Sequence, residues 1–307
     1  MPADTSLLPV AYFRKKLTPI QEASINLSSH SLQYGLTCFA GIRGYVRDGK
    51  TKIFRLQDHF NRLKNGAQIM NMPFSTTWEE FLDIIKRLVH ANKPTSDFYI
   101  RAFQFSEDPS LGPSFIGKDY DFAVYMMELR RYYDMDKGLR LMISTWRKFS
   151  DSAMPTKAKG GGCYLNSALA TTEARKAGYD EALMMSEEGH IVEGSVANLF
   201  IVYRDEVITP DLSEPILDGI TRRTIIELLQ EEGIPIRLGN IDRSMVYTCN
   251  ELMLTGTAAQ VVYAHSVDGR LIGQGDIAGP ICQLLRKKYA EIIAGTHPKS
   301  STWFTTI

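Results

Sequence analysis

The 307-residue sequence lacks the features of secreted, membrane-spanning and nucleic-acid-binding proteins. Its four cysteines are scattered and form no C-x-x-C pair, which argues against a disulfide framework and a structural zinc site. No apolar run approaches the roughly 18 residues that a membrane span needs. The 35 basic residues balance 35 acidic ones, so neither nucleic acid nor an anionic membrane is expected as a partner. The start of the chain is a poor signal peptide, and we expect a cytoplasmic protein.

The sequence also lacks the residue patterns of histidine-based and cysteine-based hydrolase sites. The six histidines are scattered and none belongs to an H-E-x-x-H motif, so no metal site is predicted. Cys163 has no histidine near it in sequence and nothing marks it as an activated nucleophile.

Strand-like and helix-like segments alternate without a strict β-α-β rhythm, which favours an α+β fold. Residues 37–56 read as a hairpin around Asp48-Gly49. Residues 57–70 read as a helix with Phe60, Leu63 and Ile69 near one face.

Other segments extend this pattern. Thr77, with Glu80 three residues on, predicts a capping box for the next helix. Two strands are predicted at 97–105 and 121–129, and two later helices at 221–233 and 279–294.

The chain divides where hydrophobic periodicity lapses and charge accumulates. This happens in residues 130–138, which we interpret as an interdomain linker. The prediction is a small α+β domain at 1–129 and a larger domain at 139–307.

Two lysines precede three glycines in "KAKGGGCYLNS", where Lys157 and Lys159 lie two apart and point the same way if the segment is extended. The order excludes a phosphate loop of the Walker type, in which the lysine follows the glycines. The glycines allow a close backbone approach, and a desolvated lysine beside them would be a nucleophile. The alternative is a solvated loop charge.

Glu193 in "HIVEGSVANLF" follows two apolar residues and precedes a glycine. A buried carboxylate needs a cationic or protonated partner, because isolated burial is costly. The alternative is a turn glutamate at the end of a strand.

Thr221 and Thr257 each follow a glycine, in "LDGITRR" and "TGTAAQ". Free N–H groups and hydroxyls at such starts bind anions, phosphate especially. An ordinary N-cap at Thr221 and a turn at Thr257 are the alternatives.

An arginine shares a strand face with aromatic residues at two places. Tyr99 and Arg101 lie two apart in "FYIRAF", and Phe39, Gly41 and Arg43 alternate in "CFAGIRGY". Such a face can recognise carboxylates. An exposed strand face is the alternative.

Seven motifs in this order resemble those of the branched-chain amino acid aminotransferases, which are fold-type IV pyridoxal phosphate enzymes. They are "SSHSLQYGLTCFAGIRGY", "HFNRL", "YIR", "KAKGGGCYLNS", "VEGSVANLF", "LDGITRR" and "TGTAAQ", and they cover roughly residues 25–260. The resemblance implies a small α+β N-terminal domain, a larger pseudo-barrel domain, and a homodimer or higher homo-oligomer.

The resemblance also implies roles for individual residues. Lys159 matches the Schiff-base lysine, because the family's Lys-x-Gly-Gly-x-Tyr pattern fits "KGGGCY" only from there. Glu193 matches the acid that pairs with the pyridine nitrogen, and Tyr164 the tyrosine beside the phenolic oxygen of the cofactor. The phosphate positions are Arg62, Ile220, Thr221 and Thr257. The substrate positions are Phe39, Tyr99, Arg101, Thr257 and Ala258, together with Tyr34 from the second subunit.

The implied activity moves the amino group of leucine, isoleucine or valine to 2-oxoglutarate, with pyridoxal 5'-phosphate as the electron sink. Glutamate and a branched-chain 2-oxo acid are formed by ping-pong kinetics, and the reverse direction is the step of branched-chain amino acid biosynthesis.

Three positions depart from the family pattern. Ala40 replaces the glutamate of "FEGIR", Ala102 the proline of "YIRP", and Cys163 the asparagine before the tyrosine. These departures leave relaxed selectivity open, including activity on (R)-amines. The alternatives of the same fold are D-amino acid aminotransferase, (R)-amine transaminase and aminodeoxychorismate lyase. Those of other classes are a non-catalytic carboxylate-binding protein and a cysteine hydrolase that uses Cys163.

Overall fold

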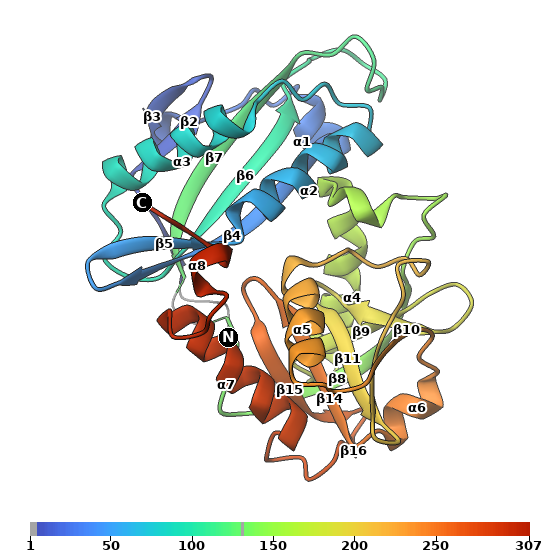
Figure 1. The fold of residues 1–307 in the computed structure, drawn as a ribbon. Coiled ribbons are helices and arrows are strands. Elements are labelled where there is room, and N and C mark those ends of the chain that lie inside the picture. Colours follow the sequence, from blue (N-terminus) through green and yellow to red (C-terminus); the bar gives the residue numbers. More distant parts are fainter. Residues whose placement is uncertain (1–4, 130–131) are drawn as a thin grey trace. The chain divides into compact units, whose positions relative to one another are not determined.

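The computed structural model describes residues 5–129 and 132–307 and divides into two compact units (Figure 1). The first unit contains Met1–Tyr132, Ala158–Gly162 and Pro298–Ile307. The second contains Tyr133–Lys157 and Cys163–His297. Residues 130–131 of the predicted linker lie outside the described residues, and the domain boundaries stay a prediction.

An eight-stranded sheet forms the first unit, in the order β17-β5-β4-β6-β7-β2-β3 with β1 paired to β7. Its strands are β1 Thr5–Leu7, β2 Val10–Phe13, β3 Lys16–Pro19, β4 Thr37–Arg47, β5 Lys50–Phe54, β6 Phe98–Ser106, β7 Tyr120–Leu129 and β17 Phe304–Thr306. Its helices are α1 His30–Tyr34, α2 Leu56–Ile69, α3 Trp78–Asn92 and α8 Ser300–Trp303, with a 3₁₀ turn at Ile20–Glu22.

Local sequence signals set two of these elements as predicted. Asp48 and Gly49 both have positive φ (51° and 70°), which the tight turn of the β4–β5 hairpin requires. At the start of α3, the Glu80 N–H donates to Thr77 Oγ1 at 3.2 Å and the Thr77 N–H donates to Glu80 Oε2 at 2.8 Å. The predicted hairpin and capping box are confirmed.

Helices α2 and α3 cover one face of the sheet and enclose the core of the first unit (Figure 1). Phe60 and Leu63 of α2 are buried there as predicted, but Ile69 is 49 % exposed. The prediction for Ile69 was wrong, because a position nine residues beyond Phe60 lies about half a turn away around the helix. Ala67 occupies the buried face instead.

The second unit is built on a closed barrel of six strands. These are β8 Leu139–Arg147, β9 Glu181–Met185, β10 Ile191–Gly194, β11 Asn198–Tyr203, β14 Glu251–Gly256 and β15 Gln260–Val267. The order is β10-β9-β8-β15-β14-β11, and the β10–β11 pairing closes the ring. Strand β8 runs parallel to β9 and β15, whereas the other neighbours are antiparallel.

Short strands and four helices surround the barrel (Figure 1). They are β12 Glu206–Thr209, β13 Ile236–Leu238, β16 Arg270–Leu271, α4 Tyr164–Lys176, α5 Ile220–Glu231, α6 Arg243–Thr248 and α7 Pro280–Ala294. The predicted α+β fold with a pseudo-barrel is confirmed.

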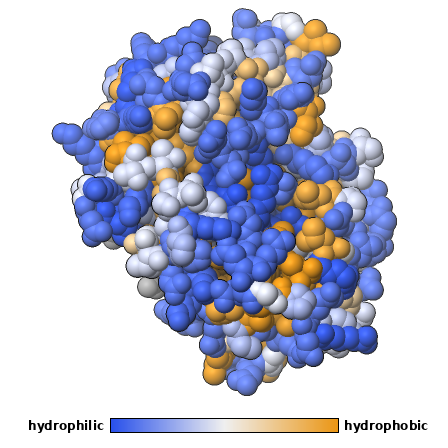
Figure 2. Space-filling model, viewed as in Figure 1, coloured by the Kyte–Doolittle hydropathy of each residue, from blue (hydrophilic) through white to orange (hydrophobic). Residues whose placement is uncertain are grey.

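Within the described chain, no helix has both the length and the apolar character that crossing a membrane requires. The face drawn in Figure 2 is mainly hydrophilic, with several separate hydrophobic patches.

The glycine-rich segment Ala158–Gly162 packs within the first unit on β4 and α2. A Cβ on Gly66 of α2 would lie 2.3 Å from the Ala158 carbonyl oxygen. A Cβ on Gly161 would lie 2.1 Å from Thr37 Oγ1. The segment is not extended, because Thr156–Ala158 forms a 3₁₀ turn and Lys159 has a φ of 52°. These glycines therefore fit the lysine-bearing segment closely against its own unit.

We predict that Gly66→Ala lowers the free energy of unfolding by up to about 2 kcal/mol, measured by urea denaturation. Alanine favours a helix over glycine by about 1 kcal/mol. Forcing a methyl group against the Ala158 carbonyl costs about 1–3 kcal/mol and displaces the segment that carries Lys159. Asn65→Ala, at an exposed neighbouring position, is the control and should stabilise slightly. A Gly66→Ala protein more stable than the wild type would contradict this packing.

Candidate active site

Lys159 is held in an unusual backbone conformation. Its φ of 52° lies in the left-handed region, which costs a non-glycine residue about 1–3 kcal/mol unless its surroundings impose it. The Phe39 N–H donates to the Lys159 carbonyl at 3.2 Å, and Gly160 forms a bridge with Cys38. The Lys159 ammonium lies 5.0 Å from the centroid of the Phe39 ring. Strand β4 therefore fixes both the backbone and the direction of this lysine.

Lys157, by contrast, is a surface charge. Its Nζ lies 3.3 Å from Asp151 Oδ1, and the two side chains are 31 % and 58 % exposed. For Lys157 the solvated alternative holds.

An arginine and aromatic residues gather on the sheet face opposite α2 and α3. Arg101 Cζ lies 4.3 Å from the Phe39 ring centroid and 5.4 Å from that of Tyr99. Its Nη2 is 3.4 Å from the Tyr99 hydroxyl. Gly41 pairs with Arg101 across the strands, and a Cβ there would lie 1.6 Å from the Tyr99 hydroxyl oxygen. The absence of a side chain at Gly41 lets Tyr99 lie across β4.

Arg101 is half-buried and still has capacity for an anion. Among the described residues, no carboxylate lies within ion-pair distance of Arg101, and its buried Nε has no hydrogen-bond partner. A half-buried guanidinium without an internal counter-ion is suited to an incoming carboxylate. The prediction of a shared strand face is confirmed by the register of β4 and β6.

Sequence reasoning missed Tyr125 of β7, which lies opposite Arg101 of β6 in the sheet. Burial raises the pKa of Tyr125, and the nearby Arg101 charge opposes that rise. Its ring lies 6.2 Å from that of Phe103. The alternation along 120–129 gives the correct face, but only the β6–β7 register places Tyr125 beside Arg101.

Two of the three departures lie away from this face. Ala40 and Ala102 pair directly across β4 and β6, and both are buried in the core beneath α2 and α3. Both side chains belong to that core and not to the Arg101 face.

Two further predicted residues lie on helices of the first unit. Arg62 is buried on α2, one turn before Gly66, and therefore on the helix face that meets Ala158. Tyr34 is the last residue of α1 and is 36 % exposed, with its ring 5.0 Å from that of His30.

In the second unit, Glu193 is the third residue of β10 and is buried. Lys148 Nζ lies 2.6 Å from its Oε1. Its Oε2 accepts hydrogen bonds at 3.2 Å from the Leu217 N–H and at 3.2 Å from Asn198 Nδ2. The ammonium and the two N–H donors supply the hydrogen bonds and the positive charge that a buried carboxylate needs. Glu193 is thus the buried acid with a cationic partner, and the turn alternative is wrong.

The start of α5 adjoins this carboxylate through Asn198. A Cβ on Gly219, the N-cap, would lie 2.0 Å from Asn198 Oδ1. Ile220 and Thr221 are the first two helical residues, so Thr221 is not the N-cap. The N-cap makes no side-chain hydrogen bond, and this 12-residue helix presents free N–H groups beside Thr221.

Thr257 and Ala258 lie in the turn that follows β14, and a turn was the alternative for Thr257. A Cβ on Gly256 would lie 3.8 Å from Ala197 Cβ, in the hairpin loop between β10 and β11. This hairpin therefore brings the turn and Glu193 into one region of the second unit. Tyr164 begins α4 directly after Cys163.

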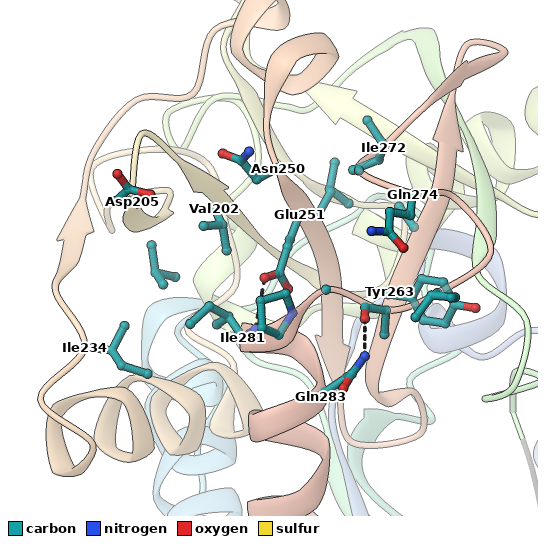
Figure 3. A pocket seen from close by; sticks show the side chains of 18 residues that line it. Val202, Asp205, Ile234, Asn250, Glu251, Tyr263, Ile272, Gln274, Ile281 and Gln283 are labelled. Atoms are coloured by element: carbon teal, nitrogen blue, oxygen red, sulfur yellow. Dashed lines mark hydrogen bonds between the residues drawn. The ribbon is translucent and has the colours of Figure 1, made fainter.

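A separate cavity of about 580 Å³ lies in the second unit, and none of the predicted site residues lines it (Figure 3). Its main charged group, Glu251, accepts hydrogen bonds from the Ile281 and Cys282 N–H groups at 2.9 and 2.8 Å. This carboxylate is used to cap α7.

Three of the four cysteines are buried. Burial raises the pKa values of Cys38, Cys249 and Cys282 to about 12, so these thiols stay protonated. No cluster of histidine, cysteine, aspartate and glutamate among the described residues has the geometry to hold a metal ion.

Residues 37–267 match the amino-transferase class IV family. The chain belongs to the class IV aminotransferases. A probable branched-chain-amino-acid aminotransferase of Aquifex aeolicus is 37 % identical over 300 residues, which cover 97 % of this chain and 96 % of that protein. The branched-chain-amino-acid aminotransferase of Escherichia coli (strain K12) is 31 % identical over 300 residues, with 96 % of each covered.

Solved structures agree closely. A branched-chain aminotransferase from Thermoproteus uzoniensis with norvaline has a TM-score of 0.93 at 35 % identity, covering 98 % of this chain and 99 % of that one. A T.th. branched-chain amino acid aminotransferase with N-(5'-phosphopyridoxyl)-L-glutamate has a TM-score of 0.92 at 35 % identity, covering 97 % and 98 %. The predicted resemblance and fold type are confirmed.

We predict that at most one of the four thiols of the native class IV aminotransferase reacts with a disulfide thiol reagent within minutes at about pH 8. A thiol with a pKa near 12 is about one part in 10⁴ thiolate at that pH, and burial restricts access further. Cys163→Ala should abolish the native reaction, whereas unfolding should expose every thiol. Rapid reaction of two or more native thiols would contradict the burial of Cys38, Cys249 and Cys282.

Proposed function

We propose that this chain is a pyridoxal-phosphate-dependent transaminase that moves the amino group of leucine, isoleucine or valine to 2-oxoglutarate by a ping-pong mechanism. Family membership and the branched-chain relatives support the reaction class. The observation that carries the assignment is that Lys159 and Arg101 both lie against the Phe39 ring. A candidate nucleophilic amine and a carboxylate-binding cation thus share one neighbour.

Pyridoxal 5'-phosphate is the cofactor, and the chain offers groups that fit each part of it. Relatives have been solved with pyridoxamine 5'-phosphate and in a PLP-form. The Lys159 amine can bond to the aldehyde carbon. Glu193 Oε1 holds one donor, Lys148, and has a second lone pair for a ring N–H. The assignment of both residues to one cofactor follows from the resemblance.

The remaining cofactor contacts are part of the same proposal. The free N–H groups at the start of α5 suit a phosphate, with Ile220 and Thr221 there and Thr257 in the neighbouring turn. Arg62 supplies a buried positive charge, and Tyr164 serves the phenolic oxygen.

When bound, the cofactor would supply an electron sink for the electron pair that stays on the substrate Cα when its proton is removed. Lys159, whose amine would be free once a substrate amine has taken its place, would move this proton as general base and then as general acid. Glu193 holds a proton on the ring nitrogen, because an ionised acceptor stabilises the charged donor.

Substrate recognition requires one pocket for a branched apolar side chain and for the side-chain carboxylate of glutamate. Phe39, Tyr99 and Tyr125 supply aromatic surface, and Arg101 supplies the positive charge. Thr257 and Ala258 complete the pocket in this proposal. The T.th. relative was solved with both 4-methylvaleric acid and a phosphopyridoxyl-glutamate adduct, which fits such dual recognition.

A homodimer or higher homo-oligomer belongs to the proposal, with Tyr34 lent to the second subunit. Leu27 and Leu32, near Tyr34 in sequence, are strongly exposed, which suits a surface that a partner covers. The four free cysteines suit a cytoplasmic location, because that compartment is reducing.

The rival activities predict different substrates. D-alanine or an (R)-amine as the better donor would favour the D-amino acid or (R)-amine transaminases, and lyase activity without amino transfer would favour aminodeoxychorismate lyase. The core position of Ala40 and Ala102 supports the ordinary L-amino acid range over relaxed selectivity. A non-catalytic carboxylate-binding protein would bind 2-oxoglutarate and carry no cofactor.

We predict that borohydride reduction of the purified protein attaches the cofactor to Lys159, found by peptide mapping. Lys159→Ala should abolish both the label and turnover and still bind cofactor weakly, since the phosphate-binding residues are intact. Lys157→Ala is the matched control and should keep both, because its side chain pairs with Asp151 at the surface. Label on Lys157, or near wild-type turnover by Lys159→Ala, would refute the assignment.

We predict that Arg101→Ala slows the glutamate half-reaction by about 10- to 150-fold, which corresponds to the loss of a hydrogen bond to a charged group. The leucine half-reaction should change much less, because its side chain offers no charge to pair with. Single-turnover rates with each substrate provide the measurement.

Arg14→Ala is the control, because Arg14 forms an exposed ion pair with Glu107. Equal losses for leucine and glutamate would mean that Arg101 only supports the fold of the pocket. A loss confined to leucine would refute dual recognition.

A further inference from the structure

We propose that Lys148 is a positioning residue. In the cofactor-free protein its ammonium is the counter-charge of Glu193, and in the loaded protein it shares Glu193 with the ring nitrogen of the cofactor. The inference rests on the proposed pairing of Glu193 with the ring nitrogen, and it assigns a role to a residue outside the motifs of the resemblance.

Lys148 is built into the second unit beside Glu193. It directly follows β8, and its N–H donates to the Met185 carbonyl of β9 at 2.8 Å. The Lys148 and Glu193 side chains are only 10 % and 7 % exposed, and Nζ lies 2.6 Å from Oε1. Among the described residues, Glu193 is the one carboxylate within ion-pair distance of the Lys148 ammonium. The ion pair with Glu193 therefore offsets the cost of burying this ammonium.

The two carboxylate oxygens of Glu193 have different hydrogen-bond partners. Oε2 accepts from the Leu217 N–H and from Asn198 Nδ2, which fixes the plane of the carboxylate. Asn198 Nδ2 also donates to the Leu217 carbonyl at 2.9 Å, and this second hydrogen bond holds the Asn198 side-chain amide in place. Oε1 is held by Lys148 alone and has a lone pair left for a donor.

A buried carboxylate without a cation is strongly unfavourable, so the cofactor-free protein needs Lys148. A protonated ring nitrogen is a second cation for the same acid. In the loaded protein, the ring N–H can replace part of the electrostatic stabilisation that the Lys148 ammonium gives Glu193. The ring cation and the ammonium also repel each other. Lys148 should therefore stabilise the empty site and weaken the binding of the protonated ring.

The test compares Lys148→Met, Lys148→Arg and, as a matched control, Lys157→Met in the purified full-length protein. The readouts are the unfolding midpoint with and without cofactor, and the Kd of pyridoxamine 5'-phosphate, which binds without a covalent bond to Lys159. We expect Lys148→Met to lower the midpoint of the cofactor-free form by several degrees more than that of the loaded form. Its Kd should fall about tenfold, the effect of one neighbouring charge.

Lys148→Arg should restore wild-type values, and Lys157→Met should change nothing. If Lys148→Met does not fold, Lys148→Gln removes the charge, keeps a donor, and should shift both readouts in the same direction. Equal loss of stability in both forms with an unchanged Kd would show a purely structural pair and overturn the proposal. A higher Kd would also overturn it.

Glu193→Gln separates this inference from the proposed function on which it rests. Loss of the acid should weaken pyridoxamine 5'-phosphate binding, and an unchanged Kd would refute the role of Glu193 itself. In the Glu193→Gln background, Lys148→Met should leave the Kd unchanged, because the ring nitrogen is then no longer held protonated and Lys148 has neither a shared acid nor a ring cation to act on. A normal response to Glu193→Gln with a persistent Lys148 effect in the double variant would refute the role of Lys148 alone.

Discussion

The burial of one ionised carboxylate constrains much of the second unit. Glu193 lies inside the barrel wall, where an isolated charge would be very costly, so its neighbours must supply donors. Lys148 comes from the end of β8, Asn198 from β11, and the Leu217 N–H from the segment that leads into α5. Satisfying this charge therefore draws three separate chain segments together. The same contacts place the free N–H groups of α5 close to the acid.

A comparable constraint acts in the first unit, where Lys159 has a strained left-handed backbone. Close packing imposes this conformation, because Gly66 and Gly161 admit the Ala158 carbonyl and the Thr37 side chain. The lysine then lies against Phe39, on whose ring Arg101 also lies. Strand β4 thus determines the direction of the nucleophile candidate and the position of the substrate cation through a single side chain.

Local patterns in the sequence predicted the elements well, and the motif order predicted the family. The Asp48-Gly49 hairpin and the Thr77–Glu80 capping box are short-range signals, and both are confirmed. The prediction for Ile69 was wrong because the helical repeat places it on the side of α2 opposite Phe60. Lys148, Asn198 and Tyr125 could not be found, because their neighbours lie far away in sequence and depend on strand register. The core location of Ala40 and Ala102 likewise needed the pairing of β4 with β6.

We propose that Lys159 carries pyridoxal phosphate and that the protein exchanges amino groups with branched-chain amino acids. The visible absorption spectrum of the purified protein tests it most directly. We expect a cofactor band that disappears when L-leucine is added and returns when 2-oxoglutarate follows, with neither change in Lys159→Ala. A protein without a visible band after incubation with the cofactor, or a band that L-leucine leaves unchanged, would contradict the account.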